Sequence, residues 1–147
     1  AKSNFLNKHQ LAGKNIDYLF IKSKDKLIDK LSEYNLMYLP LAFDKVSTNT
    51  YVQIRTAFAT KSMEYMQSGR PILVHAKSDT FTYKYFYENN AAICLPSNKK
   101  EDLKNKILDI NKGKIDMEDI LNNSKKLLKK HYVEDIAPKF RKLINQL

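Results

Sequence analysis

Short, nearly continuous apolar runs alternate along the chain with segments in which apolar residues recur every three or four positions. Runs of the first kind are typical of strands covered on both faces, and segments of the second kind are typical of amphipathic helices. The strand candidates are residues 16–21, 36–41, 72–76 and 91–95. The alternation predicts an α/β fold, a Rossmann-like parallel sheet with helices on both faces.

The segments between the strands carry the usual signals of helix ends. Predicted helices cover residues 24–34, 61–68 and 80–89, a segment after Ser97, two closing segments, 117–128 and 133–147, and a short segment at residues 3–11. Ser23 and Ser97 stand at expected N-caps, and Gly69 and Gly113 at expected stops. Pro138 interrupts the last pattern, which predicts a kink or a helix start there. No strand candidate precedes residue 16, so the sheet is expected to lack its first strand and the chain to be a fragment of a longer two-domain protein.

Composition limits the size and setting of the fold. With 147 residues and 43% hydrophobic content, the chain is expected to form a single domain. One cysteine, Cys94, lies in an apolar run, so no disulfide framework can form and a reducing, cytoplasmic compartment is expected. No apolar run approaches the roughly 20 residues of a membrane-spanning helix.

The chain is strongly basic. Its 26 Lys+Arg and 16 Asp+Glu give a formal net charge of +10, which favours nucleic acid, anionic lipid or a polyphosphate ligand as a partner. A solvated lysine-rich surface explains the charge equally well. The lysines at 125, 126, 129 and 130 form a basic face that can rest on a peripheral anionic membrane or simply face water. The aromatic run at residues 81–87 can stack bases, but core packing is the simpler interpretation.

Residues 57–74 carry the clearest chemical signal. They read as a loop, a short helix, a glycine stop and a buried strand. Thr60 and Ser62 bracket a helix start whose free amides suit an anion, and Lys61 adds a positive charge. Glu64 follows one turn later, near the sheet edge where open α/β folds bind ligands, and its carboxylate can accept two ribose hydroxyls. An ordinary N-cap and an exposed helical glutamate would explain the same residues.

The same stretch resembles the signature helix of retaining GT-B glycosyltransferases of the family 4-like group (glycosyl transferases group 1). Lys61, Glu64, Gly69 and Pro71 carry the resemblance. It continues in residues 39–44 and in a closing segment, His131 and Tyr132 followed by an amphipathic helix. The resemblance implies the C-terminal, donor-binding half of a GT-B fold. That domain would bind a nucleotide diphosphate sugar whose hexose is transferred to a glycan or lipid-linked acceptor.

The resemblance also implies roles for individual residues. It assigns the donor ribose to Glu64, the diphosphate to Thr60, Lys61 and Ser62, and the nucleobase to the backbone at Ile21 and Lys22. The catalytic and acceptor-side residues would belong mainly to an N-terminal GT-B domain. Because transfer needs a cleft between two domains, this chain alone is expected to bind rather than to transfer.

The chain departs from the family pattern in two places. Many members carry a second glutamate eight positions before Glu64, where this chain has Thr56, and the Arg/Lys pair that usually holds the diphosphate is not found. Arg55 can meet a phosphate instead or be a plain surface arginine. His75, at a strand end, is a candidate cleft contact or a hydrogen-bonded structural histidine.

Other chemistries find little support in the sequence. His9 and His131 lie far apart and there is a single cysteine, so neither a metal site nor a cofactor is expected. With three glycines, the chain contains neither a Walker loop nor a dinucleotide fingerprint. Two alternatives stay open. One is a flavodoxin-like or receiver-like interaction module with Asp44 beyond a strand, and the other is a basic nucleic-acid-binding domain, the less favoured partner class.

Overall fold

The protein forms a parallel three-stranded sheet surrounded by helices. A computed structural model describes residues 16–43 and 48–146. The strands are β1 (Met37–Pro40), β2 (Ile72–His75) and β3 (Ile93–Leu95), arranged in the order β1-β2-β3. Met37 aligns with Ile72 and Leu73 with Ile93, and both pairings are parallel. The predicted α/β, Rossmann-like fold is therefore confirmed.

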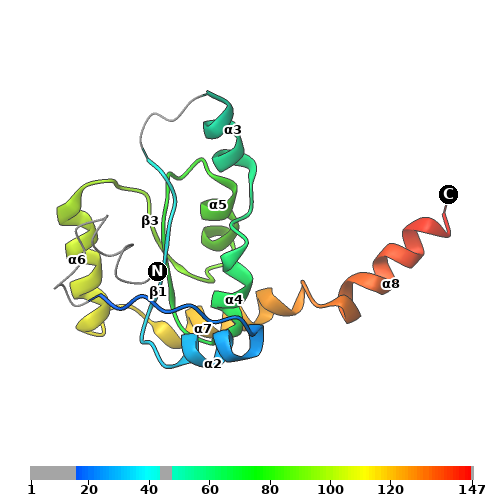
Figure 1. Ribbon diagram of the computed structural model, residues 1–147. Coiled ribbons are helices and arrows are strands. Elements are labelled where there is room, and N and C mark those ends of the chain that lie inside the picture. The colour runs from blue at the N-terminus through cyan, green and yellow to red at the C-terminus, as the bar shows by residue number, and fades with distance from the viewer. Residues whose placement is uncertain (1–15, 44–47, 147) are drawn as a thin grey trace.

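Helices follow every strand, as the sequence pattern predicts (Figure 1). They are α2 (Lys24–Ser32), α3 (Thr48–Thr56), α4 (Lys61–Gln67), α5 (Phe81–Glu88), α6 (Lys100–Asn111), α7 (Met117–Lys129) and α8 (Val133–Ile144). Six of the seven match predicted helices. α3 was not predicted, because its sequence has no apolar stripe, and it is held instead by packing against α5 and by a hydrogen bond of 2.6 Å from Tyr51 Oη to Asp79 Oδ2.

One predicted strand was wrong. Residues 16–21 form no strand and most are exposed, with Phe20 75% accessible. The run is apolar enough for a strand, but it borders a hollow against α2, whose Leu27 and Leu31 also line that hollow. Residues 16–21 therefore lie beside a helix on one side only, whereas a central strand needs to be buried on both of its faces.

The sheet is covered by two layers with separate cores. On one face, Ile72 and Val74 belong to a core completed by α4, α5 and the end of α7. On the other face, Leu73 packs with Ile93, Leu95 and the apolar sides of α6 and the start of α7. The alternation along β2 explains why its run is continuously apolar.

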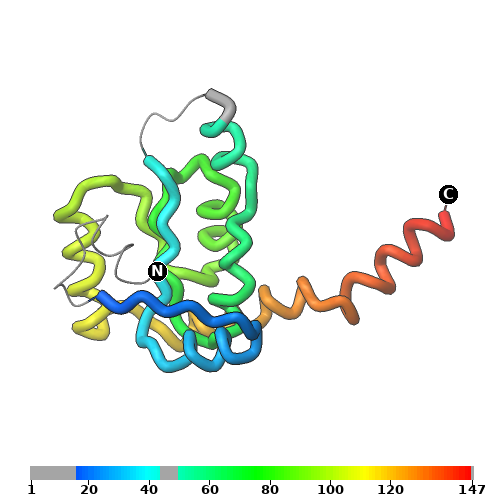
Figure 2. The backbone as a smooth tube through the Cα atoms, viewed as in Figure 1, coloured from blue at the N-terminus to red at the C-terminus, as the bar shows by residue number. Residues whose placement is uncertain are grey.

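The C-terminal helix α8 leaves the body of the fold (Figure 2). It runs through Pro138 without starting or ending there. Of the two outcomes predicted for this proline, a kink or a helix start, the helix start is therefore wrong. None of its described residues is buried, although its sequence is amphipathic.

Three of the features predicted from the sequence cannot be compared with the structure. The short helix predicted at residues 3–11, His9 and Asp44 lie outside the described residues.

Candidate functional site

The candidate site is built around the start of α4. Because α4 ends just before β2 begins, it runs antiparallel to the strands, and its first turn lies toward the carboxyl ends of the sheet. α4 packs against α2, α7 and β1. Glu64 faces α2, whose last residue, Ser32, accepts a hydrogen bond from Arg70 just before β2 begins. Glu64 therefore lies nearer the amino ends of the strands than the carboxyl-end edge where open α/β folds bind ligands.

A buried threonine fixes the loop that leads into α4. The Ala59 amide donates to Thr82 Oγ1 at 3.0 Å, and the Thr82 hydroxyl donates to the Ala57 carbonyl at 3.1 Å. Thr82 belongs to α5 and is completely buried. Both hydrogen bonds tie the loop to a helix of the core, which fixes the direction in which α4 starts.

Phe58 anchors the same loop through its ring. It contacts the rings of Phe81, Tyr85, Phe86 and His131. The His131 ring lies nearly parallel to it, with centroids 6.0 Å apart, and the Tyr85 hydroxyl is hydrogen bonded to His131 Nε2. His131 therefore acts as a packing residue between the end of α7 and the loop.

Glu64 lines a small hollow between α2 and α4. The hollow has a volume of about 270 Å³, and its other walls are Leu27, Leu31, Lys61 and Tyr65. Glu64 Oε2 is buried and has no hydrogen-bond partner among the described residues. Leaving a buried carboxylate oxygen unpaired costs free energy, which hydroxyl donors from a ligand would offset.

Tyr65 and Lys61 give this hollow its polar character. Burial, and to a lesser degree the negative charge of Glu64, raise the pKa of the Tyr65 hydroxyl. The phenol is therefore a neutral hydrogen-bonding group at physiological pH, while Lys61 supplies a positive charge. A hollow with two leucine walls and one carboxylate, one ammonium and one phenol suits a ligand with both hydroxyl and anionic groups.

A second hollow borders the first. It has a volume of about 280 Å³, is lined by residues from 17–21 and α2, and shares Leu27 and Leu31 with the first hollow. Ile21 lines it, and Lys22 is exposed beside it. The resemblance assigned the nucleobase to Ile21 and Lys22 and the ribose to Glu64. These two segments, which are far apart along the chain, thus border neighbouring hollows.

The three residues predicted to contact an anion at the start of α4, Thr60, Lys61 and Ser62, differ in their exposure. Thr60 is exposed and makes no side-chain cap. Ser62 is fully buried, and its amide already donates to the Ala59 carbonyl at 2.9 Å. Lys61 is therefore the side chain of the three that both lines the hollow and carries charge.

Arg55 and Thr56 lie on α3, outside both hollows. The Thr56 hydroxyl donates to the Val52 carbonyl within its own helix at 2.8 Å. Arg55 is exposed near Asp79. The hydrogen bond from Tyr51 holds the pKa of Asp79 below its ordinary value, and Arg55 adds a smaller effect in the same direction.

His75 is held by its neighbours. Its Nε2 is 2.6 Å from the Ser97 carbonyl and its Nδ1 is 2.6 Å from the Tyr38 hydroxyl, while the Phe43 ring lies 4.8 Å away between centroids. Because a carbonyl can only accept, Nε2 carries a proton. These contacts favour the structural interpretation of this histidine.

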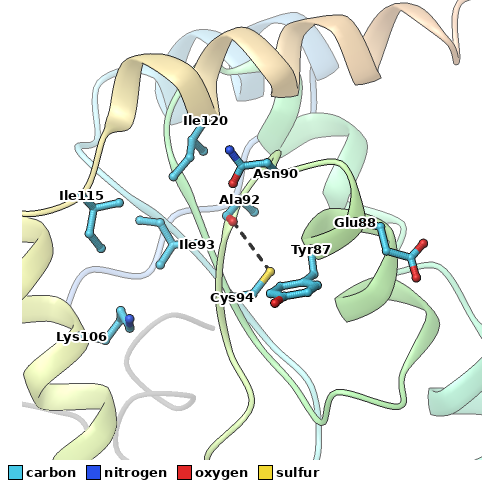
Figure 3. Close-up of a pocket in the computed structure, with 9 residues that line it drawn as sticks. All are labelled: Tyr87, Glu88, Asn90, Ala92, Ile93, Cys94, Lys106, Ile115 and Ile120. Carbon is cyan, nitrogen blue, oxygen red and sulfur yellow. Dashed lines mark hydrogen bonds between the residues drawn. The ribbon is translucent and has the colours of Figure 1, made fainter.

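A larger hollow lies elsewhere, beside the edge strand β3 (Figure 3). It has a volume of about 620 Å³ and none of the predicted site residues lines it. Figure 3 shows Cys94 among the residues that line it, with Glu88 on α5 and Lys106 on α6. Burial raises the pKa of the Cys94 thiol to about 12, so the thiol is protonated at neutral pH and a poor nucleophile.

Several contributing residues were not predicted from the sequence. Leu27 and Leu31 fall within the helix predicted at residues 24–34 and were given no part in a site, although they line both hollows. Tyr65 and Thr82 carried no recognisable signal. Among the described residues, no group of three or more His, Cys, Asp and Glu side chains could hold a metal ion. None of the helices described in residues 16–146 has the length and apolar content that crossing a bilayer takes.

No protein-family model, curated protein or solved structure matches the chain. Any assignment of function therefore depends on its own residues and on the motif in α4.

Proposed function

We propose that this chain is the donor-binding domain of a glycosyltransferase, which binds a nucleotide diphosphate sugar in the hollows between α2, α4 and residues 17–21. Glu64 would accept the ribose hydroxyls and Lys61 would meet the diphosphate. The observation that carries the proposal is the buried, unpartnered Oε2 of Glu64 at the position where the α4 motif resembles the family's ribose-binding glutamate.

The chemistry of the hollows supports a nucleotide over a purely apolar ligand. A carboxylate that accepts two hydroxyls recognises a ribose diol, and an ammonium beside it meets a phosphate as a point charge. Ile21 and Leu27 offer apolar contact to a base on the adjoining side. Transfer of the hexose to a glycan or lipid-linked acceptor would need a second domain across the cleft, to orient the acceptor and exclude water.

The test is thermal stabilisation of the chain by UDP, GDP, ADP, CMP and their sugars. A ligand that binds only the folded state stabilises it by about 2.7 kcal/mol at a concentration of 100 times its Kd, which raises the midpoint by several degrees. We expect one base to give this shift and Glu64→Ala to abolish it.

Two matched variants sharpen the result. Glu64→Gln keeps the shape but removes the charge, so without ligand it should be neutral or stabilising, while nucleotide stabilisation falls. Glu88→Gln makes the same change beside the larger hollow at β3 and should leave nucleotide stabilisation intact. Stabilisation that depends on Glu88 and not on Glu64 would move the ligand to the other hollow and refute the proposal.

A further inference from the structure

Helix α8 carries a row of exposed apolar residues that the candidate site does not explain. Its exposed apolar residues are Val133, Ile136, Phe140, Leu143 and Ile144. They recur every three or four positions and so share one face of the helix. Figures 1 and 2 show α8 leading away from the other helices, and within the described residues nothing buries this face.

An uncovered amphipathic helix of 12 residues is marginal in water. Large apolar side chains gathered on one exposed face mark a surface that contacts something else. The structure of α8 is therefore expected to be stabilised by a partner surface.

The charges on α8 indicate what kind of surface that is. Phe140 lies near the middle of the apolar face, and its neighbours in sequence are Lys139 and Arg141. Since successive helical residues are about 100° apart, these two cations flank the apolar face on opposite sides. Such flanking residues can extend their charged ends to lipid headgroups while the apolar face is buried.

The basic charge of the whole chain is concentrated near this helix. Residues 125–146 contain seven lysine or arginine residues and two acidic residues, so they supply +5 of the formal net charge of +10. The lysines at 125, 126 and 129 are exposed on α7, and Lys130, which caps its C-terminal end, is exposed as well. The two acidic residues, Glu134 and Asp135, lie in the first turn of α8, where the helix dipole stabilises negative charge.

We infer that α8 lies in the interface of an anionic lipid bilayer, with Phe140 and Leu143 among the acyl chains and the basic residues on the headgroups. The excess of positive charge on and beside the apolar face favours an anionic surface over a neutral apolar groove of another protein. This interaction goes beyond nucleotide binding and does not require it.

The experiment is co-sedimentation of the full chain with vesicles of phosphatidylcholine alone and with vesicles that also contain phosphatidylglycerol. We expect binding to the second kind only, weakened when the salt concentration rises because exposed charges are screened. Lys139→Ala and Arg141→Ala should each lower the partition coefficient about fivefold, the equivalent of about 1 kcal/mol per charge near the surface.

Phe140→Asp should lower binding more than about tenfold, since it both removes an apolar anchor and adds a negative charge. No residue of α8 is buried, so this variant removes no core contact and should keep the parent's melting temperature. Lys104→Ala on α6, an exposed lysine that pairs with Glu101, is the matched charge control and should bind as the parent does.

Three vesicle-binding results would overturn the inference. They are failure to bind either kind of vesicle, equal binding to neutral and anionic vesicles, and unchanged binding by Phe140→Asp. A dimer detected by sedimentation that Phe140→Asp dissociates would also overturn it, by assigning the apolar face to a second copy of the chain.

Discussion

Replacing Thr82 by valine tests the idea that one side chain holds the loop before α4. Valine has nearly the same shape as threonine but no hydroxyl. Thr82→Val therefore removes the bonds to the Ala59 amide and the Ala57 carbonyl while keeping the packing of α5. The loop that begins the candidate site loses its polar attachment to the core.

The two lost bonds differ in cost. Ala59 is half-buried, so its amide loses a partner in a site that water reaches poorly, at a cost of about 1–3 kcal/mol. Ala57 is exposed, and water can replace the bond to its carbonyl at little cost. We expect Thr82→Val to lower the free energy of unfolding by about 2 kcal/mol, which corresponds to about 6 °C in melting temperature for a domain of this size.

Urea unfolding followed by circular dichroism measures this loss. Thr82→Ser keeps the hydroxyl and removes one buried methyl group, so it should cost only about 0.8 kcal/mol. Thr56→Val removes an exposed hydroxyl bonded within its own helix and should change stability by less than about 0.5 kcal/mol. If Thr82→Val costs no more than Thr82→Ser, the hydroxyl does not hold the loop and the reasoning fails.

Two further predictions concern a turn and the cysteine. Gly69 has φ +67°, and a Cβ added there would meet nothing within 4 Å. Gly69→Ala should therefore lower the free energy of unfolding in urea by about 1 kcal/mol through backbone strain alone, and Gly69→Asn by less. Equal losses for the two variants would show that backbone strain is not the cause. Cys94, whose pKa is raised from 9.0 to about 12, should resist a thiol reagent at pH 8 until the chain is unfolded. Because the raised pKa belongs to the folded state, its contribution to stability is complete below pH 9 and is lost as the pH rises toward 12. Cys94→Ala should remove that part of the pH dependence, and rapid labelling of the folded chain would show that the thiol is not buried.

The pattern of apolar residues was sufficient for most of the fold. Residues 36–41, 72–76 and 91–95 contain β1, β2 and β3, as their apolar runs predicted. The expected cover on both faces is wrong for β1, because Tyr38 and Pro40 are exposed on one of its faces. Local signals such as Gly69 and the apolar stripe of α7 were equally informative, because they act within one element. Residues 16–21 show the limit, since an apolar run can border a helix as well as join a sheet.

The candidate site was only partly visible in the sequence. The motif singled out Lys61 and Glu64, which line one hollow, but it could not distinguish them from Ser62, whose side chain the fold buries. Thr82 is hydrogen bonded to Ala59 and Ala57, which lie 23 and 25 positions before it in the chain. No local sequence pattern indicates a contact over such a separation. Sequence by itself determined the elements other than α3 and the segment 16–21, together with the charged residues of the α4 motif, because these depend on neighbours along the chain. Only the packing of α2, α4 and α5 in three dimensions decided which side chains line a hollow, such as Glu64, and which make hydrogen bonds within the fold, such as Thr82.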